Sequence, residues 1–228
     1  MSVYTDGLFD VSSYNTNVGT LSMTGGEVRI GTGSLGLNGD VTVNASASGS
    51  QITSTDFKND LSLTGGTRTF TVANGAATYD LDVQAGVNVG TLVKAGSGTM
   101  RLAGTTHNNL SVTLNSGVLA LATDGALGTS GGTFTLANGR VIADGGDRVI
   151  PNPVNVTGSS AEFGSSVDGT PRALTFSGTI SLSTGSTLTV SSNAATSLSG
   201  AVSGAGGLTK SGSGTLTLGR PTSLRAPC

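Results

Sequence analysis

Leu92–Leu102 reads LVKAGSGTMRL and Leu208–Leu218 reads LTKSGSGTLTL, with seven of eleven positions identical. The copies begin 116 residues apart, so they represent a duplicated structural unit rather than a stretch of local low complexity. A unit of this size cannot bury its own apolar face, and repetition therefore predicts that such units stack along one axis. The functional question then becomes what a rod of such units does.

Shorter echoes of the same kind recur along the chain. LSMTGG at Leu21–Gly26 returns as LSLTGG at Leu61–Gly66, 40 residues later. FTVANG at Phe70–Gly75 returns as FTLANG at Phe134–Gly139, 64 residues later. These separations lie close to multiples of about 20–23 residues, which is a period typical of solenoid proteins.

The composition favours short strands joined by tight turns. The 228 residues include 37 Gly, 34 Thr and 30 Ser, and only 11% are charged, compared with about 25% in an ordinary soluble domain. Asn-Gly steps at Asn38, Asn74 and Asn138 predict turns with positive φ, and Val118–Leu127 is interpreted as a strand followed by a turn. Runs in which apolar residues alternate with polar ones predict half-buried strands; they are Glu27–Ile30, Asp40–Val43, Arg68–Val72, Thr78–Val83, Ser111–Leu114, Thr133–Leu136 and Ser186–Val190.

Together these patterns predict an all-β fold, a parallel β-helix (solenoid) over residues 1–218, with a β-sandwich as the alternative. In the duplicated unit, Met100, Leu102, Leu216 and Leu218 are expected to point inward, and Thr99, Arg101, Thr215 and Thr217 outward. Gly96, Gly98, Gly212 and Gly214 are expected at corners where no Cβ fits. Residues 219–228, GRPTSLRAPC, form an off-pattern C-terminal tail.

The duplicated unit, LxKxGxGTLxL, resembles the autotransporter-associated β-strand repeat, also called the passenger-associated transport repeat. The first copy continues in that style through a polar turn at Thr105–Asn109, a strand at Leu110–Leu114, NSGVLAL at Asn115–Leu121 and GALG at Gly125–Gly128. The clear similarity covers about 37 residues in the first copy and the eleven residues of the second. His107-Asn108-Asn109 and the tail after Leu218 depart from it.

The resemblance implies a right-handed parallel β-helix from a bacterial autotransporter-like passenger. It further implies an extracellular or cell-surface location, although MSVYTDGLFDVSS at the start lacks the pattern of a signal peptide. We expect the parent chain to continue beyond both ends. A truncated or non-functional gene fragment is the remaining interpretation of the abrupt tail.

Net charge and hydropathy argue against two classes of binding partner, nucleic acids and the membrane interior. A net charge of −2 does not predict nucleic-acid binding, which needs a basic face. No apolar run approaches the ~18 residues of a membrane helix, so no membrane insertion by this segment is expected. The single cysteine, Cys228, cannot form an internal disulfide. Weak, multivalent contacts with surface glycans or proteins are the expected interactions.

No catalytic, cofactor-binding or metal-ligating residue is assigned, and no cofactor is expected. Asp80 and Asp82 are expected to share a solvated outer strand face, with a catalytic or calcium-binding pair as the alternative. Asp144 and Asp147 flank a Gly-Gly turn, and turn chemistry accounts for them. His107, the only histidine, is expected on the surface of a turn.

Two further groups have structural interpretations. Lys94 and Lys210 occupy equivalent places in the repeat, which favours covering a corner or pairing with a carbonyl over catalysis. Phe70, Phe134 and Phe176 are expected to point inward, whereas Tyr4, Tyr14 and Tyr79 are less constrained. The chain is therefore expected to be a non-enzymatic structural or adhesin-like segment, with a β-helix polysaccharide lyase or hydrolase as the alternative function.

Overall fold

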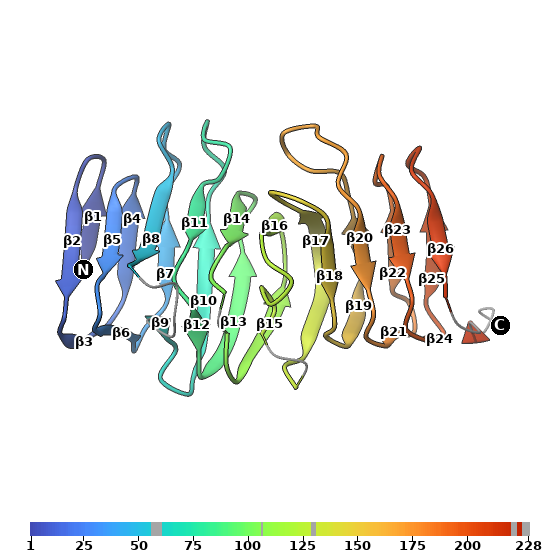
Figure 1. Cartoon of the computed structure of the whole chain (residues 1–228), viewed down its shortest axis with the longest axis horizontal. Coiled ribbons are helices and arrows are strands. Elements are labelled where there is room, and N and C mark those ends of the chain that lie inside the picture. Colours follow the sequence, from blue (N-terminus) through green and yellow to red (C-terminus); the bar gives the residue numbers. More distant parts are fainter. Residues whose placement is uncertain (56–60, 106, 129–130, 220–222, 225–228) are drawn as a thin grey trace.

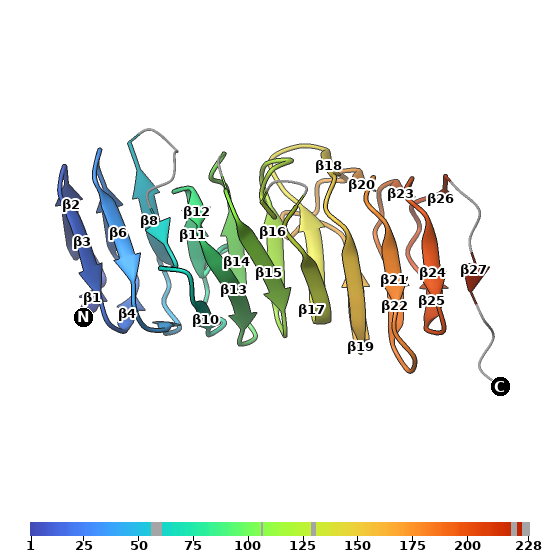
Figure 2. The same ribbon diagram turned by 90° about the horizontal axis from the view of Figure 1, so that it is seen from below.

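The structure, a computed structural model, describes residues 1–55, 61–105, 107–128, 131–219 and 223–224. The chain winds into a parallel β-solenoid of about ten turns, an elongated rod with the strand Ser2–Tyr4 near one end and the strand Leu216–Leu218 near the other (Figures 1 and 2). Every strand pair among these described residues is parallel, which confirms the predicted β-helix and excludes the β-sandwich. Among the described residues, no helix is long and apolar enough to cross a membrane.

Each turn of the solenoid contributes strands to up to three faces. The first face contains β1 (Ser2–Tyr4), β4 (Leu21–Thr24), β7 (Val41–Val43), β10 (Thr67–Val72), β13 (Gly90–Ala95), β15 (Leu110–Leu114), β21 (Ile180–Leu182), β24 (Val202–Gly204) and β27 (Ser223–Leu224), with the first halves of β17 (Phe134–Ala143) and β19 (Val154–Phe163). The second face contains β2 (Leu8–Ser12), β5 (Glu27–Ile30), β8 (Ser50–Ser54), β11 (Leu81–Val83), β14 (Thr99–Leu102), β16 (Val118–Leu121), β22 (Thr187–Val190) and β25 (Gly207–Lys210), with the second halves of β17 and β19.

The third face is formed in two separate blocks. The first block contains β3 (Asn15–Val18), β6 (Ser34–Leu37), β9 (Leu61–Ser62) and β12 (Val87–Asn88), and the second contains β18 (Arg148–Ile150), β20 (Leu174–Phe176), β23 (Thr196–Leu198) and β26 (Leu216–Leu218). Between the blocks, buried polar side chains hold the backbone in place of a strand ladder. The Asn152 amide donates to the carbonyls of Leu127, Gly128 and Gly132 at 3.2–3.4 Å.

The core consists of inward side chains that lie over one another in register. On the first face, Leu92, Val112, Phe134, Val154, Ile180 and Val202 form one such column, and all are buried. Paired residues are between 18 apart (Ser12 and Ile30) and 31 apart (Ser50 and Leu81), so many turns have about the predicted length and others carry longer loops. Because apolar columns and backbone ladders are both continuous, each turn supports its neighbours.

The duplicated unit keeps its local shape but not its place in the solenoid. The first copy runs from β13 on the first face to β14 on the second, whereas the later copy runs from β25 on the second face to β26 on the third. The unit is therefore a strand–corner–strand element that fits two different corners. LSMTGG and LSLTGG likewise lie on different faces, in β4 and β9.

The similar segments FTVANG (Phe70–Gly75) and FTLANG (Phe134–Gly139) both begin on the first face, but in different registers. Phe70 stands in register with Lys94, two positions along the strand from the column of Phe134. Phe70, Phe134 and Phe176 are buried as predicted, and Phe176 stacks on Phe163 with ring centroids 4.3 Å apart.

Corner glycines behave as predicted, whereas the Asn-Gly steps do not. A Cβ on Gly98 would lie 2.5 Å from the Ala73 carbonyl oxygen, and one on Gly212 would lie 2.0 Å from that of Ser191. Of the three Asn-Gly steps, only Gly139 has positive φ, and it lies inside β17 beside a register shift rather than in a hairpin turn. Parallel coils need no hairpins, which removes the basis of that prediction.

The last turn is less buried than the others. Met100 and Leu102 are fully buried, but Leu216 is only partly buried and Leu218 is 42% exposed. In the tail, Ser223 and Leu224 form β27, which pairs with β24. Residues 220–222 and 225–228, including Cys228, lie outside the described residues.

Candidate functional site

The outward side chains of the second face form a polar row across the first turns. Glu27, Gln51, Asp82 and Arg101 stand in register on β5, β8, β11 and β14. The row continues to Ala120 and Ile142, which are buried although they lie outside the core cluster. This polar row is therefore interrupted at β16 and β17, and a separate row of polar residues in register, Arg140, Glu162, Thr189 and Thr209, follows on the C-terminal half of the face.

Arg101 is the centre of a network whose members come from three turns, those of β11, β14 and β17. Its guanidinium donates to the carboxylate of Asp82 at 3.0 and 3.3 Å and, through Nε, to Asp144 Oδ2 at 2.7 Å. The Gln84 amide donates to Asp82 Oδ2 at 2.9 Å. Charge-assisted hydrogen bonds of this kind are stronger than neutral ones, so the network fixes the position of each member.

Tyr79 is fixed by the same network. Its hydroxyl donates to Asp144 Oδ1 at 2.5 Å, and the Arg101 guanidinium carbon lies 5.4 Å from the ring centroid. Burial, with the Asp144 carboxylate beside it, raises the pKa of the Tyr79 phenol to about 12. The phenol is thus held protonated as a hydrogen-bond donor at neutral pH.

The structure corrects the predictions for the acidic pairs. Asp80 and Asp82 do not share a solvated face, because Asp80 is buried and accepts the backbone N–H groups of Gly75 at 2.6 Å and Thr99 at 2.8 Å. Asp144 is buried in the Arg101 network, so turn chemistry does not account for it. Asp147 accepts the Ala173 N–H at 2.7 Å and joins two turns.

The prediction of a surface His107 is also wrong. His107 is buried, its Nδ1 accepts the Val87 N–H at 2.9 Å, and its Nε2 lies 3.1 Å from the Gly104 carbonyl oxygen. It thus joins two turns where the third face has no strand ladder. Burial lowers the pKa of His107, which favours the neutral imidazole that this arrangement requires.

Lys94 has the structural role predicted for it, in an unexpected place. It is fully buried in an inward column between Phe70 and Leu114, and its ammonium donates to the carbonyls of Ala95, Gly96 and Ser116 at 2.9–3.1 Å. Burial lowers its pKa to about 8.

Lys210 makes the same contact with the carbonyl of Gly212, but it is exposed in the last turn. Thr99, expected outward, is buried in the same region.

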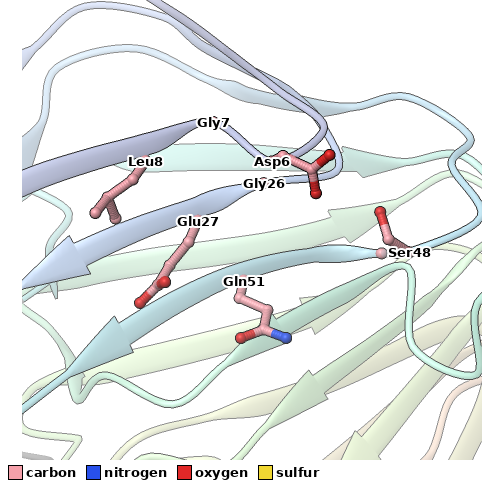
Figure 3. A pocket seen from close by; sticks show the side chains of 8 residues that line it. Asp6, Gly7, Leu8, Gly26, Glu27, Ser48 and Gln51 are labelled. Atoms are coloured by element: carbon pink, nitrogen blue, oxygen red, sulfur yellow. The ribbon is translucent and has the colours of Figure 1, made fainter.

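Two adjoining hollows lie beside the polar row. The first, of about 240 Å³, is lined by Asp6, Gly7, Leu8, Gly26, Glu27, Ser48, Gly49 and Gln51. Figure 3 shows the Glu27 and Gln51 side chains extending from neighbouring strands, with Asp6 and Ser48 at the adjoining loops. The second, of about 210 Å³, is lined by Ser48, Ser50, Gln51, Ala77, Thr78, Tyr79 and Asp82. Ser48 and Gln51 line both, so the two hollows lie side by side across the turns, and together they are called the groove below.

The groove and the network were not predicted from the sequence. Tyr79 and Asp144 lie 65 positions apart, and only the folded register brings them together. Within the described residues, no group of three or more potential metal ligands gathers at one point. Comparisons of the chain with protein-family models, curated proteins and solved structures found no significant match.

Proposed function

We propose that the chain is a non-enzymatic, adhesin-like rod from a bacterial surface protein, which presents weak and repeated contact sites away from the cell. The observation that carries the proposal is that the charged groups of the second face hold the turns together. Arg101 is held between Asp82 and Asp144 from other turns, and the Glu27 carboxylate accepts the Thr53 hydroxyl of the next turn at 2.6 Å.

A catalytic acid or base needs a proton that can be exchanged with substrate. Asp80 accepts two backbone N–H groups, and Lys94 donates to three carbonyls inside the core. One contact of each residue, Asp80 with Thr99 and Lys94 with Ser116, joins neighbouring turns, so the same residues stiffen the rod. They favour a mechanical role over polysaccharide cleavage, which was the alternative function.

The repeat resemblance and the extended shape support the location at a bacterial surface. A rigid rod with similar turns can offer several weak sites at fixed spacing, and such sites gain strength when they act together. The broad Thr- and Ser-rich surface supplies hydroxyl groups for contacts of this type.

The test compares one copy with many copies. The chain would be coupled to beads at increasing density and applied to surfaces coated with glycans or host-type proteins. We expect retention to rise steeply with density, by about a hundredfold or more over the free chain. Tight binding by the free chain with no effect of density, or cleavage of a coated glycan, would overturn the proposal.

A further inference from the structure

We infer that the groove formed by the two hollows binds an uncharged oligosaccharide laid across successive turns of the second face. The inference rests on the proposed function and names the ligand class and the site. The groove shares its central residues, Ser48 and Gln51, between both hollows. A chain-like ligand that crosses both would therefore contact the same two side chains at its middle.

The hydrogen-bonding groups of the groove suit sugar hydroxyls. The exposed Gln51 amide offers both donors and an acceptor, the Asp6 carboxylate offers acceptors, and neither has a partner among the described residues. The Ser48 hydroxyl lies 3.4 Å from that of Ser46, a long contact that leaves it able to bond a ligand. A sugar hydroxyl both donates and accepts, so it can satisfy each of these groups.

Tyr79 gives the groove a rigid aromatic wall. Its hydroxyl is held by Asp144 and it lies against the Arg101 guanidinium, so the ring is fixed before a ligand arrives. Pre-ordering of a contact side chain reduces the entropic cost of binding. Tyr79 is one of the residues that line the second hollow, together with Thr78 and Asp82.

Charge selects against acidic sugars. Asp6, Glu27 and Asp82 line the two hollows, and no lysine or arginine lies among the lining residues. The nearby cations Arg29 and Arg101 are already paired with Glu27 and Asp82. Because these ion pairs also neutralise Glu27 and Asp82, the repulsion that a polyanionic glycan meets comes mainly from the Asp6 carboxylate, and a neutral chain meets none.

The geometry of the rod matches an extended ligand. Adjacent strands lie about 4.8 Å apart, and the groove crosses β2, β5, β8 and β11 in that direction. Each additional sugar unit therefore reaches a further turn. Affinity is expected to rise with oligosaccharide length until both hollows are filled.

The experiment measures binding of the monomeric chain to neutral gluco- and manno-oligosaccharides of increasing length, and to oligogalacturonate of matched length, by calorimetry. Gln51→Ala is expected to weaken neutral binding about tenfold, since each lost hydrogen bond is worth roughly that factor. Thr189→Ala on β22 is the matched control, because it removes an outward polar group from the same face away from the groove. Circular dichroism confirms that both variants fold.

Asp6→Asn provides a second variant. Asp6 has a φ of 61°, a conformation that asparagine also tolerates, so the fold should be kept. The change is expected to narrow the preference for neutral over acidic oligosaccharides. Equal affinity of Gln51→Ala and the parent chain, a preference for oligogalacturonate, or no binding of any neutral oligosaccharide would overturn the inference.

The bead assay separates the inference from the proposed function. If beads carrying the parent chain adhere and beads carrying Gln51→Ala adhere equally well, the groove is not the contact site but the adhesive function stands. If neither adheres to any surface, the proposed function fails as well.

Discussion

The ammonium groups of Lys94 and Lys210 make the same contact in two different corners of the solenoid. Each donates to the carbonyl of the glycine two residues later, Gly96 in one copy of the repeat and Gly212 in the other. The first corner joins the first and second faces, and the other joins the second and third. The lysine is therefore part of a local corner element, and its burial depends on what lies above it.

Because Lys94 is buried and Lys210 is exposed, only Lys94 should make the stability of the chain depend on pH in the alkaline range. Burial lowers the folded-state pKa of Lys94 to about 8, below the ordinary value of 10.5. Between these pH values the unfolded chain binds more protons, so the free energy of unfolding should rise with pH, by at most about 3 kcal/mol. Chemical denaturation between pH 8 and 10 would measure this rise. Lys94→Met should abolish it and Lys210→Met should retain it; equal slopes in the two variants would contradict the assignment.

His107 should make stability depend on pH in the acidic range. Its folded pKa is lowered by burial, so protonation below its ordinary value of 6.5 favours the unfolded chain. The melting temperature should fall as pH drops from 7 to 5, and less steeply in His107→Gln. At pH 7 that variant should lose about 1–3 kcal/mol of stability, the cost of disturbing a buried hydrogen-bonded group. A variant that melts with unchanged pH dependence would show that another group is responsible.

The same leucine should tolerate charge in one copy of the repeat but not in the other. Leu102 is fully buried and Leu218 is 42% exposed, although both end the eleven-residue unit. Leu102→Asp should unfold the chain or cost more than about 3 kcal/mol, because it places an unpaired charge in the core. Leu218→Asp should change stability by no more than about 1 kcal/mol. Urea denaturation of both variants checks this, and similar losses would disprove the difference in environment.

The corner glycines should differ sharply from exposed ones. A Cβ at Gly98 would lie 2.5 Å from a backbone oxygen and 2.7 Å from Asp80 Oδ2, whereas one at Gly19 would meet nothing within 4 Å. Gly98→Ala should destabilise the chain by about 1–3 kcal/mol through overpacking. Gly19→Ala is the matched control and should be near neutral. Thermal melting that ranks them in the reverse order would refute the close approach.

The Tyr79–Asp144 hydrogen bond can be tested by measuring the pKa of the Tyr79 phenol. The chain has three tyrosines, so Tyr4→Phe and Tyr14→Phe together leave Tyr79 as the only one. Its pKa of about 12 should fall in Asp144→Asn, because the carboxylate contributes to the rise, while burial keeps it above 10. Ultraviolet titration measures this directly. An unchanged pKa would mean that Asp144 does not accept the Tyr79 hydrogen bond in solution.

Much of the fold was predictable because strands and core follow local rules. Alternation located the seven strand runs, and the duplicated unit indicated stacking before any register was known. The register itself was not predictable, since loops of unequal length shift equivalent segments between faces. LSMTGG and LSLTGG illustrate this: both precede a glycine corner, yet they lie on different faces.

The polar network was not predictable for the same reason. Arg101 meets Asp82, 19 positions away, and Asp144, 43 positions away, only once the turns are in register. Local context instead assigned Asp144 to a turn and His107 to the surface. Burial of a polar side chain depends on the turns above and below it, and no short window of sequence contains that information.

The most direct measurement for the proposed function counts the products that the chain releases from glycans while it is bound to them. Beads carrying many copies would be incubated with neutral and acidic polysaccharides, and both retention and newly formed chain ends would be measured. We predict retention of neutral glycans on densely coated beads, with no more chain ends than on beads carrying the unfolded protein. Release of chain ends that is lost in Arg101→Ala would contradict a mechanical, adhesive role and establish an enzyme.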